Sequence, residues 1–350
     1  MMRLQRTSLI LGTGLIFLTA CGGGGSTTPQ TIVDPQPDPK PLPDPPVKPK
    51  SNYSLFLQQG IVSIKNSPDT NFGAKDLSVW GFSSVESNPP GNVIVPGTTI
   101  DAEINKTVTV NVKNNLATAH DFSFVNSQVT ITPSKTPIAV GATTTYTITP
   151  KTEGIFIYSD ALVNGVNQSL GLYGVMIVRP AVSQGNVVWM GGPSFTKEVT
   201  WVIADLDYKN YNTVAINNGA NDGEANVKTA NYKANYFLMN GMNGFQAMED
   251  PKTTIQGTID EIVLVRIANT GQYSQSLHFH GNHFQVISRN GVRLKEFESQ
   301  DTINVKPSQT AMVLYTIDQI GHYPMHVHTA QMETGGGVYL NGTAAMIVGK

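Results

Sequence analysis

Beyond its N-terminal segment, the amino-acid sequence predicts an all-β protein made of β-sandwiches. Val108, Val110 and Val112 alternate with polar residues, which is the period of a strand with one buried face. Short apolar runs at 262–267 and 312–317 are bounded by turn residues, as buried strands are. No long segment has the 3.6-residue period of an amphipathic helix, and the 33 glycines and 21 prolines favour turns. A sandwich is the architecture that these patterns favour.

The N-terminus predicts export and lipidation. Two arginines precede an apolar run from Leu9 to Leu18, and the run ends in Leu18-Thr19-Ala20-Cys21. This tetrapeptide resembles the lipobox of bacterial lipoproteins, in which the cysteine becomes the lipidated first residue of the mature chain. The alternative is an ordinary secretory signal in which Cys21 is incidental. Because the apolar run is too short to span a bilayer, we expect a signal peptide at 1–20 and membrane attachment through the lipid anchor only.

Residues 21–50 have the composition of a tether. Gly22 to Gly25 is a glycine run, and nine prolines fall between Pro29 and Pro49 among Asp and Lys residues. Such a composition favours extended polyproline II, in which 20 residues reach roughly 60 Å. Gly22 is not an acidic retention signal, so by resemblance we expect an outer-membrane lipoprotein in the bacterial cell envelope, facing the periplasm or the surface.

An internal repeat divides the β region into two halves. Pro96–Ile100 (PGTTI) recurs as Pro251–Ile255 (PKTTI), and the alternating apolar residues of 104–114 match those of 259–269 at the same offset. Each half also ends on a Met-Ile-Val strand. We therefore expect two domains, at 51–180 and 181–350.

Composition excludes several functions. The single cysteine rules out an intramolecular disulfide and a multi-cysteine zinc site. A net charge of −2 with only 14% charged residues offers no basic surface, so nucleic acid is not an expected partner. The sequence contains no P-loop, GxSxG, HExxH or dinucleotide fingerprint.

Two HxH motifs in the second half point to a metal site. His278 and His280 form one pair and His326 and His328 the other. On a strand, residues i and i+2 point to the same face, so each motif can present two imidazoles together. Paired imidazoles are the commonest way to build a nitrogen-rich transition-metal site. The four histidines are therefore the predicted metal ligands.

At these motifs the sequence resembles the multicopper oxidases, which are built from cupredoxin domains. The resemblance extends over nearly all of residues 51–350 and rests on these segments: 95–100, 108–116 and 171–178 in the first half, and 236–241, 277–286 (LHFHGNHFQV), 301–303 and 321–328 (GHYPMHVH) in the second. It implies two cupredoxin-like Greek-key β-sandwich domains and copper as the cofactor, with zinc as the alternative that four imidazoles also suit.

The resemblance implies that the electron-transfer (type 1) copper is absent. The family places a cysteine between the two histidines of the last motif, and here that position is Val327. Its other type 1 positions read Gln275, Met332 and Gly337. Valine has no donor atom, so the thiolate of a blue-copper site is missing.

The resemblance also implies half of the family's trinuclear cluster, which uses eight histidines from four HxH motifs. The second half keeps its four. In the first half the matching segments read Ala119-His120-Asp121-Phe122 and Tyr158-Ser159-Asp160-Ala161. His120 and Asp160 are candidate additional metal ligands, as is the thioether of Met332.

Three functions remain open. The first is a copper-binding module that handles copper outside the cytoplasm, with copper ions as its partner. The second is an enzyme, a copper-dependent oxidoreductase acting on Cu(I), phenols or another reductant without a type 1 site. The third is a copperless envelope scaffold. The sequence specifies neither an oligomeric state nor an electron-transfer partner.

Overall fold

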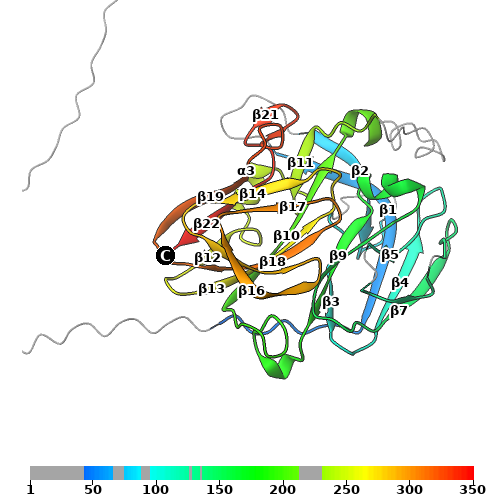
Figure 1. Ribbon diagram of the computed structural model, residues 1–350. Coiled ribbons are helices and arrows are strands. Elements are labelled where there is room, and N and C mark those ends of the chain that lie inside the picture. The colour runs from blue at the N-terminus through cyan, green and yellow to red at the C-terminus, as the bar shows by residue number, and fades with distance from the viewer. Residues whose placement is uncertain (1–42, 66–74, 88–94, 126–127, 135, 213–230) are drawn as a thin grey trace, which may run out of the picture. The chain divides into compact units, whose positions relative to one another are not determined.

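Strands are the main secondary structure of the computed structural model, which describes residues 43–350 except 66–74, 88–94, 126–127, 135 and 213–230 (Figure 1). Helices are few and short, so the predicted all-β fold is confirmed. The predicted signal peptide, Cys21 and most of the linker lie outside the described residues. Within the described part of the chain, no helix has the length and apolar character needed to cross a membrane.

Strands β1 to β9 form two sheets. The first sheet has the order β2-β1-β4-β7-β6, with β1 (Asn52–Ile64), β2 (Lys75–Ser83), β4 (Val108–Asn114), β6 (Ile131–Thr132) and β7 (Thr143–Ile148). The second has the order β3-β9-β8-β5, with β3 (Ile100–Glu103), β5 (Ser123–Phe124), β8 (Gly154–Ser159) and β9 (Tyr173–Arg179). Three short helical turns accompany them: η1 (Val163–Gly165), α1 (Val166–Ser169) and η2 (Val182–Gln184).

These two sheets pack face to face. The alternating valines of β4 are almost fully buried and share a core with Phe156 of β8 and Met176 of β9. The period-two pattern of the sequence therefore does form the predicted half-buried strand.

Strands β10 to β22 form the sheets of the second half. A six-stranded sheet has the order β11-β10-β13-β18-β15-β16, with β10 (Lys197–Leu206), β11 (Tyr236–Met239), β13 (Ile262–Asn269), β15 (Phe284–Arg289), β16 (Val292–Gln300) and β18 (Thr310–Thr316). A five-stranded sheet has the order β12-β22-β19-β14-β17, with β12 (Ile255–Gly257), β14 (Gln275–Phe279), β17 (Thr302–Val305), β19 (Gly321–Val327) and β22 (Ala344–Gly349). The remaining elements are a small hairpin, β20 (Thr334–Gly335) and β21 (Val338–Tyr339), the π-helical turn η3 (Tyr208–Asn212) and α3 (Gly244–Glu249).

The internal repeat is visible in the strand pairing and in the hydrogen bonds. β3 pairs in parallel with β9, and β12 pairs in parallel with β22, so each repeat opens beside the last strand of its own half. Asn114 and Asn269 occupy the same repeat position, and each side-chain amide donates to two backbone carbonyls at 2.7–2.9 Å. Each also accepts from the backbone N–H two residues later at 2.9 Å. The exact boundary between two domains stays a prediction.

The two halves contact each other through apolar and charged groups. A third core cluster takes residues from both, among them Val175 of β9 and Leu264 of β13. Beside it, Arg179 bonds Glu198 of β10 at 2.5 Å, and Glu198 bonds the almost fully buried Arg266 of β13 at 3.1 Å. Residues 43–350 therefore share one continuous set of contacts.

Candidate metal centre

The two HxH motifs lie side by side on one sheet. β14 and β19 are antiparallel neighbours, and His278 is directly opposite His326. Residues alternate across this sheet, so Phe279 and Val327 point into the core while the histidines of both motifs lie on the outer face. We call this group the histidine face, meaning His278, His280, His326 and His328.

The four imidazole rings gather closely on this face. The centroid of the His278 ring lies 4.3 Å from that of His328 and 4.6 Å from that of His280. The other measured pairs are 5.2–5.8 Å apart. The Nε2 atoms of His280 and His326 are 3.1 Å apart. Two nitrogens bound to one ion at 2.0–2.1 Å lie about 2.8–3.4 Å apart for bond angles between square and tetrahedral, so this pair already has the spacing of a chelate.

Neighbouring side chains orient two of the rings. The Nδ1 atom of His326 lies 2.9 Å from Oε1 of Glu333, and Nδ1 of His278 lies 2.9 Å from the hydroxyl of Thr302. When Nδ1–H donates to an oxygen, the lone pair stays on Nε2, which is the atom left for a metal. Sequence reasoning missed Glu333, because it lies in a loop after β19 where no periodic pattern reports which side chains meet.

The histidine face favours neutral imidazoles. Partial burial, followed by the nearby His328 and His280, lowers the pKa of His278 below its ordinary value. Partial burial and then His326 lower the pKa of His280. Neutral imidazole is the form that binds metals, so the lowered pKa values of His278 and His280 favour metal binding at these two residues.

The rings are close but not yet in a complete coordination geometry. Among the described residues, no three or more His, Cys, Asp or Glu side chains already converge on one ion position. His280 and His328 are exposed, so solvent borders their rings on one side. The observed arrangement is therefore a two-nitrogen chelate with two further imidazoles within reach of a small side-chain rotation.

His120 and Asp160 lie elsewhere, buried in the first half. Their side chains are fully buried and bond each other, with 2.6 Å between Nδ1 and Oδ2. No hydrogen bond, ion pair or ring contact found in the described part of the chain joins either of them to the histidine face.

Strand register corrects the expected alignment of the first half. Ser123 pairs with Ser159 between β5 and β8, as His278 pairs with His326 between β14 and β19. The first-half positions equivalent to these two histidines are therefore serines. The expectation that His120 stands at an HxH position is wrong, because pairing register and not local sequence similarity sets equivalence between strands. By the repeat offset, His120 is equivalent to Gln275.

The remaining sequence candidates take different places. Met332 is almost fully buried in the core of the second half, where it packs. His283 and His322 are exposed. Tyr323 is half-buried and packs against the same core.

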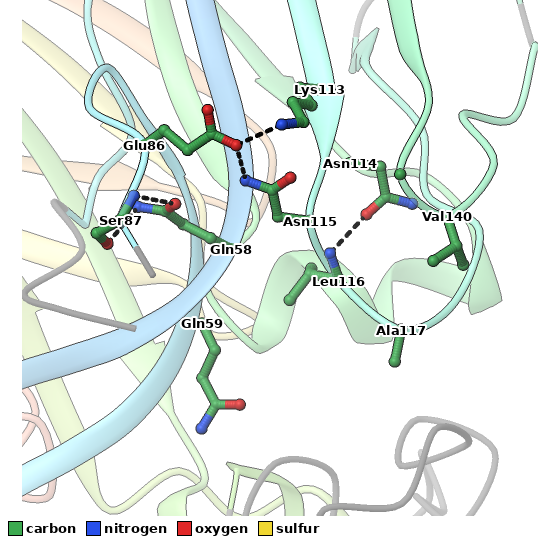
Figure 2. A pocket seen from close by; sticks show the side chains of 11 residues that line it. Gln58, Gln59, Glu86, Ser87, Lys113, Asn114, Asn115, Leu116, Ala117 and Val140 are labelled. Carbon is green, nitrogen blue, oxygen red and sulfur yellow. Dashed lines mark hydrogen bonds and ion pairs between the residues drawn. The ribbon is translucent and has the colours of Figure 1, made fainter. Parts of the chain in front are cut away.

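A separate polar cavity of about 480 Å³ lies in the first half, against β1 and β4 (Figure 2). Glu86 accepts there from Lys113 at 2.5 Å and from Asn115 at 2.9 Å, and Gln58 holds the backbone of Ser87. Its lining includes no histidine. The cavity is therefore distinct from the histidine face.

Comparison with protein-family models identifies the chain. Residues 91–183 match one multicopper oxidase model, and residues 217–340 match a second. The chain belongs to the multicopper oxidase family. A comparison with curated proteins finds no match.

Solved multicopper oxidases share the fold. The blue copper oxidase from Nitrosomonas europaea is 18% identical, with a TM-score of 0.68 and 85% of each chain covered. The multicopper oxidase mgLAC is 22% identical, with a TM-score of 0.65, 85% of this chain covered and 86% of that chain. The copper nitrite reductase from Nitrosomonas europaea is 18% identical, with a TM-score of 0.62, 85% of this chain covered and 93% of that chain. The cupredoxin-like architecture expected from the sequence is confirmed.

Membership of the multicopper oxidase family implies copper, and among the residues that the structure describes the histidine face has a donor set that fits it. The histidine face offers imidazole nitrogens, which suit copper. At the type 1 position Val327 is fully buried and has no donor atom, and Met332 and Gln275 are buried with it. A type 1 copper does not fit this multicopper oxidase relative, so no electron transfer is assigned to that position.

Proposed function

We propose that this protein is an envelope lipoprotein that binds copper at the histidine face and handles it outside the cytoplasm. The proposal is supported by the family's use of copper and by four imidazoles on one exposed sheet face. The observation that carries it is the 3.1 Å spacing of the His280 and His326 Nε2 atoms, with His326 oriented by Glu333. Zinc is the alternative ion, and copper is preferred because it binds nitrogen sites more tightly than zinc in the Irving–Williams order.

Copper stoichiometry in matched variants tests this function. Purified protein lacking residues 1–42 is loaded with copper, passed through a desalting column and analysed for metal. We expect about one tightly bound copper in the wild type and a loss in His278→Ala/His326→Ala. The control is His283→Ala/His322→Ala, which removes two exposed histidines of the same half and should keep the copper. Full retention by the first variant contradicts the proposal.

A copper-dependent oxidoreductase is the second candidate, and the exposure of His280 and His328 favours it. Exposed ligands leave a coordination position open to a substrate, as a redox metal site needs. The buried Val327 opposes it, because no thiolate links the face to an electron-transfer centre. Steady oxygen consumption by copper-loaded protein with Cu(I) or a phenol, absent in His278→Ala/His326→Ala, would establish the enzyme. Copper binding without oxygen consumption would support the copper-handling function instead.

The membrane anchor is tested separately. We propose that Cys21 carries the lipid and that the tether holds the folded part away from the outer membrane. Cells expressing the full chain should incorporate labelled palmitate into the wild type and not into Cys21→Ser, which should also leave the membrane fraction. A membrane-bound, unlabelled wild type rejects the anchor without affecting the copper proposal.

A further inference from the structure

The pair of His120 and Asp160 belongs to a fully buried cluster of three side chains. His120 follows β4, Asp160 follows β8, and Asn167 lies in α1. The Asp160 Oδ2 atom lies 2.6 Å from Nδ1 of His120 and 2.9 Å from the amide of Asn167, and the amide lies 3.4 Å from the same Nδ1. All three residues have no exposed surface. Three polar groups from three separate elements thus form a closed triangle inside the first half.

The cluster and its surroundings hold more hydrogen-bond acceptors than donors. Oδ1 of Asn167 and Oδ1 of the nearby Asp121 are buried without a hydrogen-bond partner among the described residues. Asp121 is only 4% exposed. A buried acceptor without a partner typically costs about 1–3 kcal/mol, so the unpartnered oxygen of Asn167 in this cluster indicates a group that would satisfy it.

The cluster also has more negative than positive charge. Within the described ranges, no lysine or arginine pairs with the carboxylate of Asp121 or of Asp160. Among the basic side chains there, only the imidazole of His120 contacts Asp160. Two buried carboxylates beside one imidazole require a further cation or a proton.

We propose that His120, Asp160 and Asn167 bind a divalent transition-metal ion inside the first half, independently of the histidine face. The Nδ1 atom of His120, Oδ2 of Asp160 and the amide nitrogen of Asn167 lie 2.6–3.4 Å from one another. Ligands on a single ion lie about 2.8–3.4 Å apart, so the three side chains are spaced like one face of a coordination sphere. The His120 to Asp160 distance needs to widen by only a few tenths of an ångström. Rotation of the Asn167 amide by 180° brings its unpartnered oxygen to the position of its nitrogen.

The donor set defines which ion binds and how it behaves. Imidazole with carboxylate and amide oxygens suits Zn²⁺ or Co²⁺ and lacks the thiolate of a type 1 copper. Because all three ligands are fully buried, the ion exchanges only when the first half opens. It ties α1 and the segment after β8 to the segment after β4, which is a structural role.

Chelator-resistant metal tests this site without depending on the histidine face. Protein is produced in medium with added Zn²⁺ or Co²⁺, treated with EDTA, desalted and analysed for metal. The measurement uses the His278→Ala/His326→Ala background, so that ions on the outer face do not contribute. We expect one EDTA-resistant ion per chain, reduced at least tenfold by Asp160→Asn and by Asn167→Leu. Asn167→Asp, which keeps an oxygen donor, should retain the ion.

Asn167→Leu keeps the test informative if Asp160→Asn fails to fold, because it removes the oxygen donor without changing the charge. Folding is checked by circular dichroism and thermal unfolding. A folded background protein without EDTA-resistant metal overturns the proposal, since a direct hydrogen bond between His120 and Asp160 then completes the cluster. Equal metal in the background and in folded Asn167→Leu overturns it as well.

Discussion

Replacing Gln275 by methionine should stabilise the protein. Gln275 is fully buried in β14, and both atoms of its amide lack a hydrogen-bond partner among the described residues. Leaving a buried polar group unpaired costs about 1–3 kcal/mol, whereas an apolar side chain of similar shape has no such cost. Methionine is close to glutamine in length and flexible enough to fill the same space. We therefore expect Gln275→Met to raise the free energy of unfolding by about 1–3 kcal/mol.

Urea unfolding followed by tryptophan fluorescence measures this change, and calorimetry should show a midpoint higher by about 2–4 °C for each kcal/mol. Gln285→Met is the control, because Gln285 is only partly buried in β15 and should change stability by less than about 0.5 kcal/mol. A destabilised Gln275→Met would refute the reasoning, because it would mean that a buried water or ion satisfies the amide in solution.

Three further predictions concern the metal face and the contact between the halves. Glu333→Gln should weaken copper binding by about 10–100-fold, because the partner that orients His326 becomes neutral; competition with a chromophoric chelator measures it. The lowered pKa values of His278 and His280 mean that protons compete with copper at these residues only below the ordinary imidazole pKa of about 6.5. Titrations should give a constant affinity above that pH and a loss below it, and a loss beginning well above neutral pH contradicts the prediction. Glu198→Ala should destabilise the protein by about 3–5 kcal/mol, because it leaves the buried guanidinium of Arg266 without its carboxylate. Urea unfolding measures this change, and a loss under about 1 kcal/mol would show that the pair contributes little to stability.

Sequence patterns predicted the fold well because the fold depends on local periodicity. The alternating valines of β4 and the apolar run of β13 are buried as expected, since period two leaves one face for the core. The repeat succeeded for a similar reason. Asn114 and Asn269 have the same task, because the amide of each donates to the carbonyl four residues later and to one more distant carbonyl.

The candidate site was predictable only where its residues lie on regular strands. His278 and His326 could be predicted as ligands because each lies on a strand, where residues i and i+2 share a face. Glu333 does not, because a loop brings it back to His326. Asn167 also escaped sequence reasoning, since nothing in a four-residue helix indicates contact with Asp160. The predicted equivalence of His120 to a histidine of an HxH motif was wrong. Register is set by strand pairing, and the similarity of two short segments does not reveal it.

The apolar cluster shared by the halves has a consequence for folding. Val175 of the first half and Leu264 of the second lie in one core, so the surface that each half presents at this contact is buried by the other. Deleting the first half would expose Leu264 and its neighbours to water and favour aggregation. Each half is therefore a folding partner of the other, and the two halves should melt as one unit.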